Sequence, residues 1–488
     1  MDFSRRTVLG AGAATGALSF LPGCATAAPG SDLPDWQIGY RTAPADGFGP
    51  AKMKKIFGKA PADLEGALFR NGPGQFHYGD TYASHWFDGD GMIQKISIPG
   101  GEAVHTGRFV DTHKRREEQK ANKFLAPGFG TAGDPDFPIK HPDDVNAANT
   151  SVIVIDGQLY ALWEGGSAYA LDADTLKAKG PKNWRDDLTG MPFLAHPKTE
   201  PDGRVWNLGT SGSRVVVYNI NPRGELDDFR LVDMGIPAYI HDWAMTERQL
   251  IILVQPWVHT HNIPPFVDSL EWAPDEGMKF LIIDKDDLSK QRWAQGPARA
   301  FYHTGAAWEE SDGTIRFDAA FYKEPVLGPG GGTNEMKGIY DDGGVFHADL
   351  TQIVIPTSGD ARLIETGIDG DFPQQDPRRH GLPRTTTALV SGTVPGRPGA
   401  SALSLHNWSS GKTDTFEFGS HRLVEEHLFV PKAGGSSETE CWMVGTALNT
   451  KTKASELWVF DAANVSDGPV VAWSADYAWP LGFHGTWA

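Results

Sequence analysis

Short apolar runs alternate with polar positions along most of the chain, and helical periodicity is nearly absent. Gly, Asp, Asn and Pro bound these runs, which is typical of many antiparallel strands joined by tight turns. The clearest examples are residues 151–163, 204–208, 250–255, 314–322, 402–408 and 441–448. The pattern therefore predicts an all-β protein.

One arrangement recurs four times along the chain: an apolar run that ends in Asp or Asn and a loose turn. The turns begin at Asp172, Asn219, Asp284 and Asp461. A histidine follows each of them after 19 to 24 residues, and these histidines are His196, His241, His303 and His484. The similar separations indicate that each histidine holds the same position in a repeated unit.

The distances between these histidines give the size of the unit. His196 and His241 are 45 residues apart, His303 follows after another 62, and His484 after another 181, or about three units. Periods of about 40–60 residues with four short strands each are typical of propeller blades. The chain has room for about seven. Because the inner strands of all blades meet near one axis, we expect the four imidazoles to hold one metal ion there.

Residues 1–28 have the features of a twin-arginine export signal. Arg5 and Arg6 precede a run of small apolar residues, and Ala25-Thr26-Ala27 offers a cleavage site. We therefore expect a periplasmic protein in which residues 29–488 form a single domain. Cys24 follows Leu-Pro-Gly and also resembles a lipoprotein-processing site, so a lipid anchor is an alternative.

The formal net charge of −18 argues against nucleic-acid binding, which depends on Lys and Arg. Besides Cys24 the chain has only Cys441, so we expect no internal disulfide and no cysteine-bound metal cluster. No segment after the export signal has the ~18 apolar residues of a membrane-spanning helix. Two segments rich in large apolar residues, 123–130 and 257–272, could make peripheral contact with a membrane at a tunnel mouth.

Several segments together resemble the carotenoid cleavage oxygenase family. They are G-A-L-F-R-N-G-P-G at residues 66–74, H-W-F-D-G-D-G-M at 85–92, the four histidine segments and the terminal G-F-H-G-T-W. The family includes apocarotenoid and stilbene cleavers and the vertebrate retinoid isomerase, and the resemblance spans residues 64–487. It implies a seven-bladed β-propeller, capped by loops, with one Fe(II) per chain on the axis. The implied ligands are His196, His241, His303 and His484.

The resemblance also implies three acidic residues that hydrogen-bond ligand histidines. Glu164 and Glu426 match, whereas Asp371 stands where the family usually has Glu and would either sit closer or act through water. Thr150 matches a residue that crowds one coordination position. The aromatic residues that resemble the lining of the substrate tunnel are Trp163, Tyr239, Tyr302 and Phe372.

These features predict an Fe(II) dioxygenase that cleaves a double bond of a carotenoid or apocarotenoid with O2 to give two carbonyl products. No catalytic side chain is expected beyond the metal centre. One alternative is a stilbene or phenylpropenoid cleaver, which Phe109 and Trp163 disfavour because they stand where stilbene cleavers have a phenol-gripping Tyr and Lys. Others are an isomerase or hydrolase that uses the iron as a Lewis acid, and a non-catalytic polyene-binding propeller.

Overall fold

Strands dominate the computed structural model of this protein, which describes residues 33–327, 332–340 and 348–488. The predicted export signal, including Cys24, lies outside the described residues. Residues 34–488 form one compact unit. Its described part contains one α-helix, α1 (His113–Ala121), and none of its helices is both long and apolar enough to cross a membrane.

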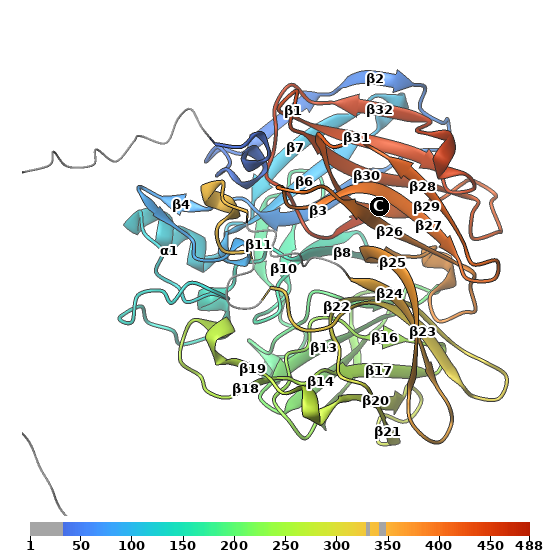
Figure 1. Ribbon diagram of the computed structural model, residues 1–488. Helices are drawn as coiled ribbons and strands as arrows, with labels where there is room; N and C mark the ends of the chain where they lie inside the picture. Colours follow the sequence, from blue (N-terminus) through green and yellow to red (C-terminus); the bar gives the residue numbers. More distant parts are fainter. Residues whose placement is uncertain (1–32, 328–331, 341–347) are drawn as a thin grey trace, which may run out of the picture. The chain divides into compact units, whose positions relative to one another are not determined.

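Four of the sheets are separate and have four or five strands each (Figure 1). The first runs in the order β1 (Phe48–Lys52), β7 (Val104–Phe109), β6 (Gly91–Ser97), β3 (Ala67–Pro73) and β33 (Gly485–Trp487). The second is β11 (Ala178–Pro181), β10 (Tyr169–Leu171), β9 (Gln158–Leu162) and β8 (Ser151–Ile155). The third is β12 (Lys198–Thr199), β13 (Val205–Ser211), β14 (Arg214–Ile220) and β15 (Leu226–Asp233). The fourth is β16 (Ala244–Met245), β17 (Gln249–Val254), β20 (Met278–Asp284) and β21 (Gln291–Gly296).

A continuous sheet of 12 strands makes up three further groups. The fifth group is β22 (Ala300–Glu309), β23 (Ile315–Tyr322), β24 (Asp349–Ile355) and the first part of β25 (Arg362–Gln374). The sixth is the end of β25, β26 (Thr386–Thr393), β27 (Ala400–Asn407) and β28 (Lys412–Glu417). The seventh is β29 (Arg422–Pro431), β30 (Cys441–Asn449), β31 (Ala454–Asp461), β32 (Val471–Ser474) and β2 (Lys54–Gly58). Two small hairpins, β4 (His77–Tyr78) with β5 (Thr81–Tyr82) and β18 (Trp257–His259) with β19 (Leu270–Trp272), lie apart from the seven groups.

The core lies between neighbouring groups, and β17 shows how the sequence specifies it. Leu250 and Ile252 pack toward the third group, whereas Ile251 and Leu253 pack toward the fifth. Successive side chains of a strand point to opposite faces, so a strand that is covered on both faces reads as a continuous apolar run. This burial explains the run Leu-Ile-Ile-Leu-Val that the sequence shows at residues 250–254.

Both ends of the described unit take part in closing the ring of groups. The C-terminal strand β33 pairs with β3, with Leu68 opposite Trp487. Near the other end, β2 pairs with β32 on the outer edge of the seventh group. The first group is therefore built from both ends of the chain, which fixes the C-terminal histidine segment against the β3 strand.

Candidate metal centre

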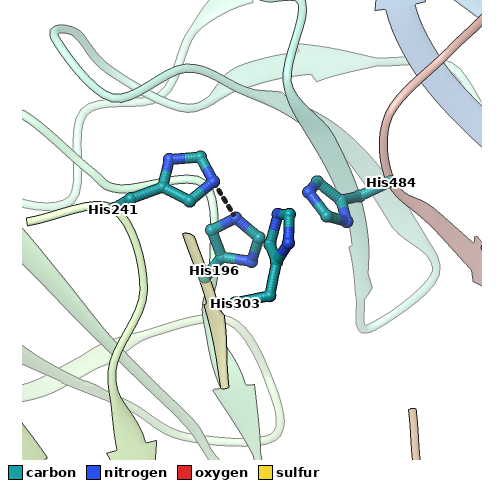
Figure 2. Close-up of side chains that lie close together, drawn as sticks. All are labelled: His196, His241, His303 and His484. Atoms are coloured by element: carbon teal, nitrogen blue, oxygen red, sulfur yellow. Dashed lines mark hydrogen bonds between the residues drawn. The ribbon is translucent and has the colours of Figure 1, made fainter. Parts of the chain in front are cut away.

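The four predicted histidines all lie at the inner-edge strand of a group. His196 lies two residues before β12, His241 three residues before β16, His303 on β22, and His484 directly before β33. One ring nitrogen of each lies within 4.8 Å of those of the other three, and the Nε2 atoms of His196 and His241 are 3.0 Å apart. Figure 2 shows the four rings gathered in one place although they come from distant parts of the chain. The cluster could hold a metal ion.

Three of the four imidazoles contact a carboxylate through Nδ1. Glu164 Oε1 contacts His241 Nδ1, Asp371 Oδ1 lies 2.8 Å from His303 Nδ1, and Glu426 Oε1 lies 3.0 Å from His484 Nδ1. A carboxylate at this position keeps the proton on Nδ1 and leaves Nε2 free as a ligand atom. The three rings are therefore fixed in the tautomer that metal binding requires.

Further donors hold the carboxylates in place. The Tyr239 hydroxyl donates to Glu164 Oε2 at 3.1 Å, and the Tyr322 hydroxyl donates to Asp371 Oδ2 at 2.7 Å. Glu426 accepts from the backbone N–H of Gly485 at 2.8 Å and from Gln374 Nε2 at 2.9 Å. Sequence reasoning missed Tyr322, which is close in sequence to neither a histidine nor a distinctive motif. It also missed Gln374, whose position directly after Asp371-Phe-Pro is the signal that could have found it.

Asp371 reaches His303 directly in spite of its short side chain. The pairing of β25 with β26 is irregular between Asp371 and Gln374, as in a β-bulge, and Phe372 has a φ of 56°. A bulge redirects the side chains beside it, and here the N–H of Phe372 also donates to Asp371 Oδ1 at 2.7 Å. The Phe372 ring then stacks on His303, with 4.6 Å between centroids.

Burial and the proximity of the other rings favour the neutral form of His196 and His484 by lowering their pKa. Burial, and next the neighbouring imidazoles, lower the pKa of His196 well below its usual value. Burial also lowers the pKa of His484, although Glu426 partly offsets it, whereas Asp371 outweighs burial and raises the pKa of His303. Buried imidazoles without a thiolate, supported by carboxylates, suit a divalent transition metal such as iron, copper or zinc. The residues therefore fit such an ion.

A second polar network joins the segments that carry His196, His241 and His303. Lys198 Nζ donates to Asp242 Oδ1 at 2.7 Å, and Asp242 Oδ2 accepts from the backbone N–H of Thr304 at 2.7 Å and its hydroxyl at 2.9 Å. These residues follow the histidines by two, one and one positions. Their closeness to predicted ligands is the signal that could have found them.

A cavity of about 1080 Å³ reaches the histidine cluster. Its wall includes most of the predicted pocket residues, namely Thr150, Trp163, Tyr239, Tyr302 and Phe372. Phe109, the remaining predicted pocket residue, is not among the residues that line this cavity, so its role in the pocket stays a prediction. Phe109 lies on β7, one strand in from the outer edge of the first group, where the Arg115 guanidinium covers its ring at 3.5 Å.

The two apolar segments considered for membrane contact differ in exposure. Phe124, in the first, is buried against Tyr78, with 5.0 Å between ring centroids, and so cannot reach a membrane. In the second, Ile263 is 69% exposed and lines the cavity together with Phe266. Both segments contribute to the cavity wall, but of the two only the second has exposed large apolar side chains, Ile263 and Phe266.

A ring of seven β-sheet groups with four inner-edge histidines at a buried cavity defines the class: a β-propeller with a candidate metal centre. The family model described as retinal pigment epithelial membrane protein (RPE65) matches residues 43–488. The chain therefore belongs to this family, the carotenoid cleavage oxygenases.

Known relatives extend the similarity along most of the chain. The apocarotenoid-15,15'-oxygenase of Synechocystis sp. is 27% identical, with 93% of this chain and 96% of the relative covered. The resveratrol cleavage oxygenase 1 of Aspergillus fumigatus is 24% identical, with 90% and 92% covered. The isoeugenol monooxygenase of Pseudomonas putida is 25% identical, with 89% and 94% covered. All three are oxygenases by name.

Solved structures confirm the fold. The cobalt-substituted apocarotenoid oxygenase of Synechocystis superposes with a TM-score of 0.84 at 25% identity, covering 93% of this chain and 98% of that one. A chimera of this oxygenase and RPE65 superposes with a TM-score of 0.85 at 23% identity, with the same coverage. These proteins are seven-bladed β-propellers, so the predicted fold class is confirmed.

Proposed function

We propose that this protein is an Fe(II)-dependent dioxygenase that cleaves a carbon–carbon double bond of a carotenoid or apocarotenoid. One observation carries the proposal: four clustered imidazoles, three of them buried and oriented by carboxylates, lie at a large cavity with a largely apolar and aromatic wall. The names of the relatives support oxidative cleavage, and the apocarotenoid oxygenase of Synechocystis supports the polyene substrate.

The four histidines would hold one iron ion, and the iron would supply the activation of O2, which no protein side chain provides. In the overall reaction the double bond breaks and each of its carbons gains one oxygen atom, so one alkene and one O2 give two carbonyl products. No proton has to move. A Ser-His-Asp triad or a pair of acid and base carboxylates is therefore unnecessary.

The remaining residues position the substrate and keep water away. Phe372 stacks on His303, and Phe483 precedes His484 with its ring 5.3 Å from that of Phe87. The Tyr239 hydroxyl is occupied by Glu164, so the ring of this tyrosine is what remains for the substrate. Aromatic walls of this kind hold a conjugated chain by burial and ring contacts.

The test is turnover by the purified iron-loaded protein with a panel of carotenoids, apocarotenals and stilbenes. We expect one O2 consumed per polyene cleaved, with two carbonyl products found by mass spectrometry. Products formed without O2 uptake would instead indicate an isomerase or hydrolase. Stilbenes belong in the panel because Phe109 is not among the residues that line the cavity, so the argument against them now depends on Trp163 alone.

We also propose that residues 1–28 direct export by the twin-arginine route. The support is the sequence alone, with Arg5-Arg6 before a small-residue run and a cleavage site at Ala25–Ala27. Changing both arginines to lysine should keep the protein in the cytoplasm, which cell fractionation measures. If Cys24 carries a lipid, the Cys24→Ser variant should move from the membrane fraction to the soluble fraction.

A further inference from the structure

The cavity extends away from the metal centre toward a second group of polar residues. A row of aromatic rings begins next to His484. The Phe483 ring contacts that of Trp86, with 4.6 Å between centroids, and the Trp86 ring contacts that of Tyr40, with 5.2 Å between centroids. Tyr40 and Arg397 line the same cavity as His241, His303 and His484. This end, which we call the Arg397 end, is therefore continuous with the candidate active site and separated from it by aromatic rings.

Arg397 is a buried cation without an acidic partner in the part of the chain that the structure describes. The residue is 7% exposed, and its guanidinium donates to the carbonyl oxygens of Pro398 at 3.0 Å and Arg422 at 2.7 Å. Its Nε–H has no partner. Burial lowers its pKa to about 10, so the side chain is still charged at neutral pH. A buried unpaired charge is costly, which indicates that something else completes this site.

Tyr40 adds a second donor at the same end. The residue is 3% exposed and its ring is held between Trp36 and Trp86. No hydrogen bond is formed by its hydroxyl with any described residue. Burial raises its pKa well above the usual value, and Arg397 and Glu335 lie close enough to shift it further in opposite directions. The hydroxyl therefore stays protonated and available to a ligand.

The acidic residue nearest to this pair does not neutralise it. Glu335, on the short 3-10 helix Glu335–Lys337, accepts a hydrogen bond from the N–H of Asn334 at 3.0 Å. Burial raises the pKa of this carboxyl. The Arg397 end thus presents the buried Arg397 guanidinium and the unused Tyr40 O–H to a largely aromatic and apolar cavity.

We propose that Arg397 and Tyr40 bind a hydrogen-bond-accepting oxygen at the end of the substrate polyene, remote from the cleaved bond. The ligand class is a polyene whose terminal ring or chain end carries a hydroxyl, carbonyl or carboxylate oxygen. Buried donors select for such an oxygen, because a substrate that lacks it leaves them unpaired. This inference rests on the proposed function, since it names the substrate class of the same cavity.

The experiment compares apocarotenals that differ only at the far end: an unsubstituted ring, the same ring with a hydroxyl, and a carboxylate end. Dissociation constants are measured without O2 by tryptophan fluorescence quenching of the metal-loaded protein, and kcat/KM is measured with O2. We expect an oxygenated end to bind about 10- to 100-fold more tightly than the hydrocarbon end. A larger gain for the carboxylate than for the hydroxyl would identify the charge of Arg397 as the main selector.

The variants are Tyr40→Phe, which keeps the ring, and Arg397→Leu, with Arg397→Lys as a second change that retains the charge. Tyr40→Phe and Arg397→Leu should remove most of the preference for the oxygenated end and lower the affinity for the oxygenated ligands. Tyr218→Phe is the matched control, because this buried hydroxyl donates to the Pro192 carbonyl at 3.0 Å and lies outside the cavity wall. Tyr218→Phe should change neither the preference for the oxygenated end nor the affinity for the ligands.

Equal binding of all three ligands by the unaltered protein would overturn the inference, as would a full preference in Tyr40→Phe and Arg397→Leu. If Arg397→Leu fails to fold, as shown by its thermal unfolding, Tyr40→Phe still decides, and Arg397→Lys shows whether the charge alone keeps the preference for the carboxylate. The proposed function fails separately: a preference for the oxygenated end without any cleavage would refute the dioxygenase and leave the recognition site standing. Cleavage without any preference for the oxygenated end would refute the recognition site and leave the dioxygenase standing.

Discussion

The change Glu426→Gln tests whether the carboxylates around the histidines support metal binding. Glu426 Oε1 contacts His484 Nδ1 at 3.0 Å and accepts from Gln374 at 2.9 Å, while Oε2 accepts from the N–H of Gly485 at 2.8 Å. Glutamine has one acceptor oxygen and one NH2 group at these two positions. If the glutamine oxygen accepts from His484 Nδ1–H, its NH2 group faces the N–H of Gly485. Two donors then face each other and no hydrogen bond forms between them.

The size of the effect follows from this geometry. Loss of a carboxylate behind a ligand histidine typically weakens metal binding 10- to 100-fold, equivalent to about 1.4–2.7 kcal/mol. The unpaired N–H of Gly485 costs a further ~1–3 kcal/mol of folding free energy, because it is part-buried where β33 joins β3. We therefore expect weaker metal binding and a lower unfolding free energy in the same variant.

The matched control is Glu425→Gln, one residue away on β29 and also buried. Glu425 accepts from the N–H of Gly482 at 2.7 Å and from the Thr446 hydroxyl at 2.6 Å. Glutamine can satisfy both, because its NH2 group can donate to the hydroxyl oxygen. This variant loses the same charge on the same strand without touching a histidine.

Affinity is best measured with Co(II), which is stable in air, by competition against a chelator while visible absorbance reports occupancy. We expect Glu426→Gln to bind about 10- to 100-fold more weakly than the unaltered protein, and Glu425→Gln to stay within about threefold. Equal affinities for Glu426→Gln and the unaltered protein would refute the reasoning. Equal weakening in both variants would show a general charge effect instead of support for His484.

Three further predictions concern closure, pH and reactivity. Deleting residues 485–488 removes β33 and its pairing with β3, so we expect a lower melting temperature and reduced metal content by elemental analysis, although His484 remains. Burial lowers the pKa of His105 to about 3, below the ~6.5 of an unfolded chain, so stability falls as pH drops through this window. In His105→Gln the slope of unfolding free energy against pH there should be smaller by up to ~1.4 kcal/mol per pH unit, measured by urea titration. Burial raises the pKa of Cys441 to about 12. In the Cys24→Ser variant, a thiol reagent at pH 8 should therefore react with Cys441 only after denaturation. Rapid reaction with the native protein would contradict the burial of Cys441.

The periodic arrangement was readable from sequence because it follows the order of strands in each group. The four apolar runs form β10, β14, β20 and β31, and Asp172, Asn219, Asp284 and Asp461 each lie within one residue of the end of their strand. Each of these is the third strand from the inner edge. The chain then forms an outer strand and enters the next group at its inner edge, where the histidine lies. A nearly constant separation is the consequence of this path.

The environment of side chains outside the repeat could not be predicted in the same way. Phe109 and Phe124 are aromatic residues near recognisable segments, but which way each ring faces depends on how the chain folds around it, with Arg115 over Phe109 and the distant Tyr78 against Phe124. The direct contact of Asp371 with His303 depends on a bulge and a left-handed Phe372, and the sequence Asp-Phe-Pro does not specify either. In each case, contacts made only in the folded chain determine how the side chain is oriented.

Charge balance explains why one imidazole lacks a carboxylate partner among the described residues. Glu164, Asp371 and Glu426 together carry three negative charges, so a dipositive ion would leave the buried cluster with a net charge of about −1. A fourth carboxylate behind His196 would add an uncompensated buried charge, which is costly. Beside the His196 segment, Asp242 is instead paired with Lys198, whose Nζ lies 2.7 Å from Asp242 Oδ1. This pair therefore ties the His196 and His241 segments together without adding to the charge at the metal site.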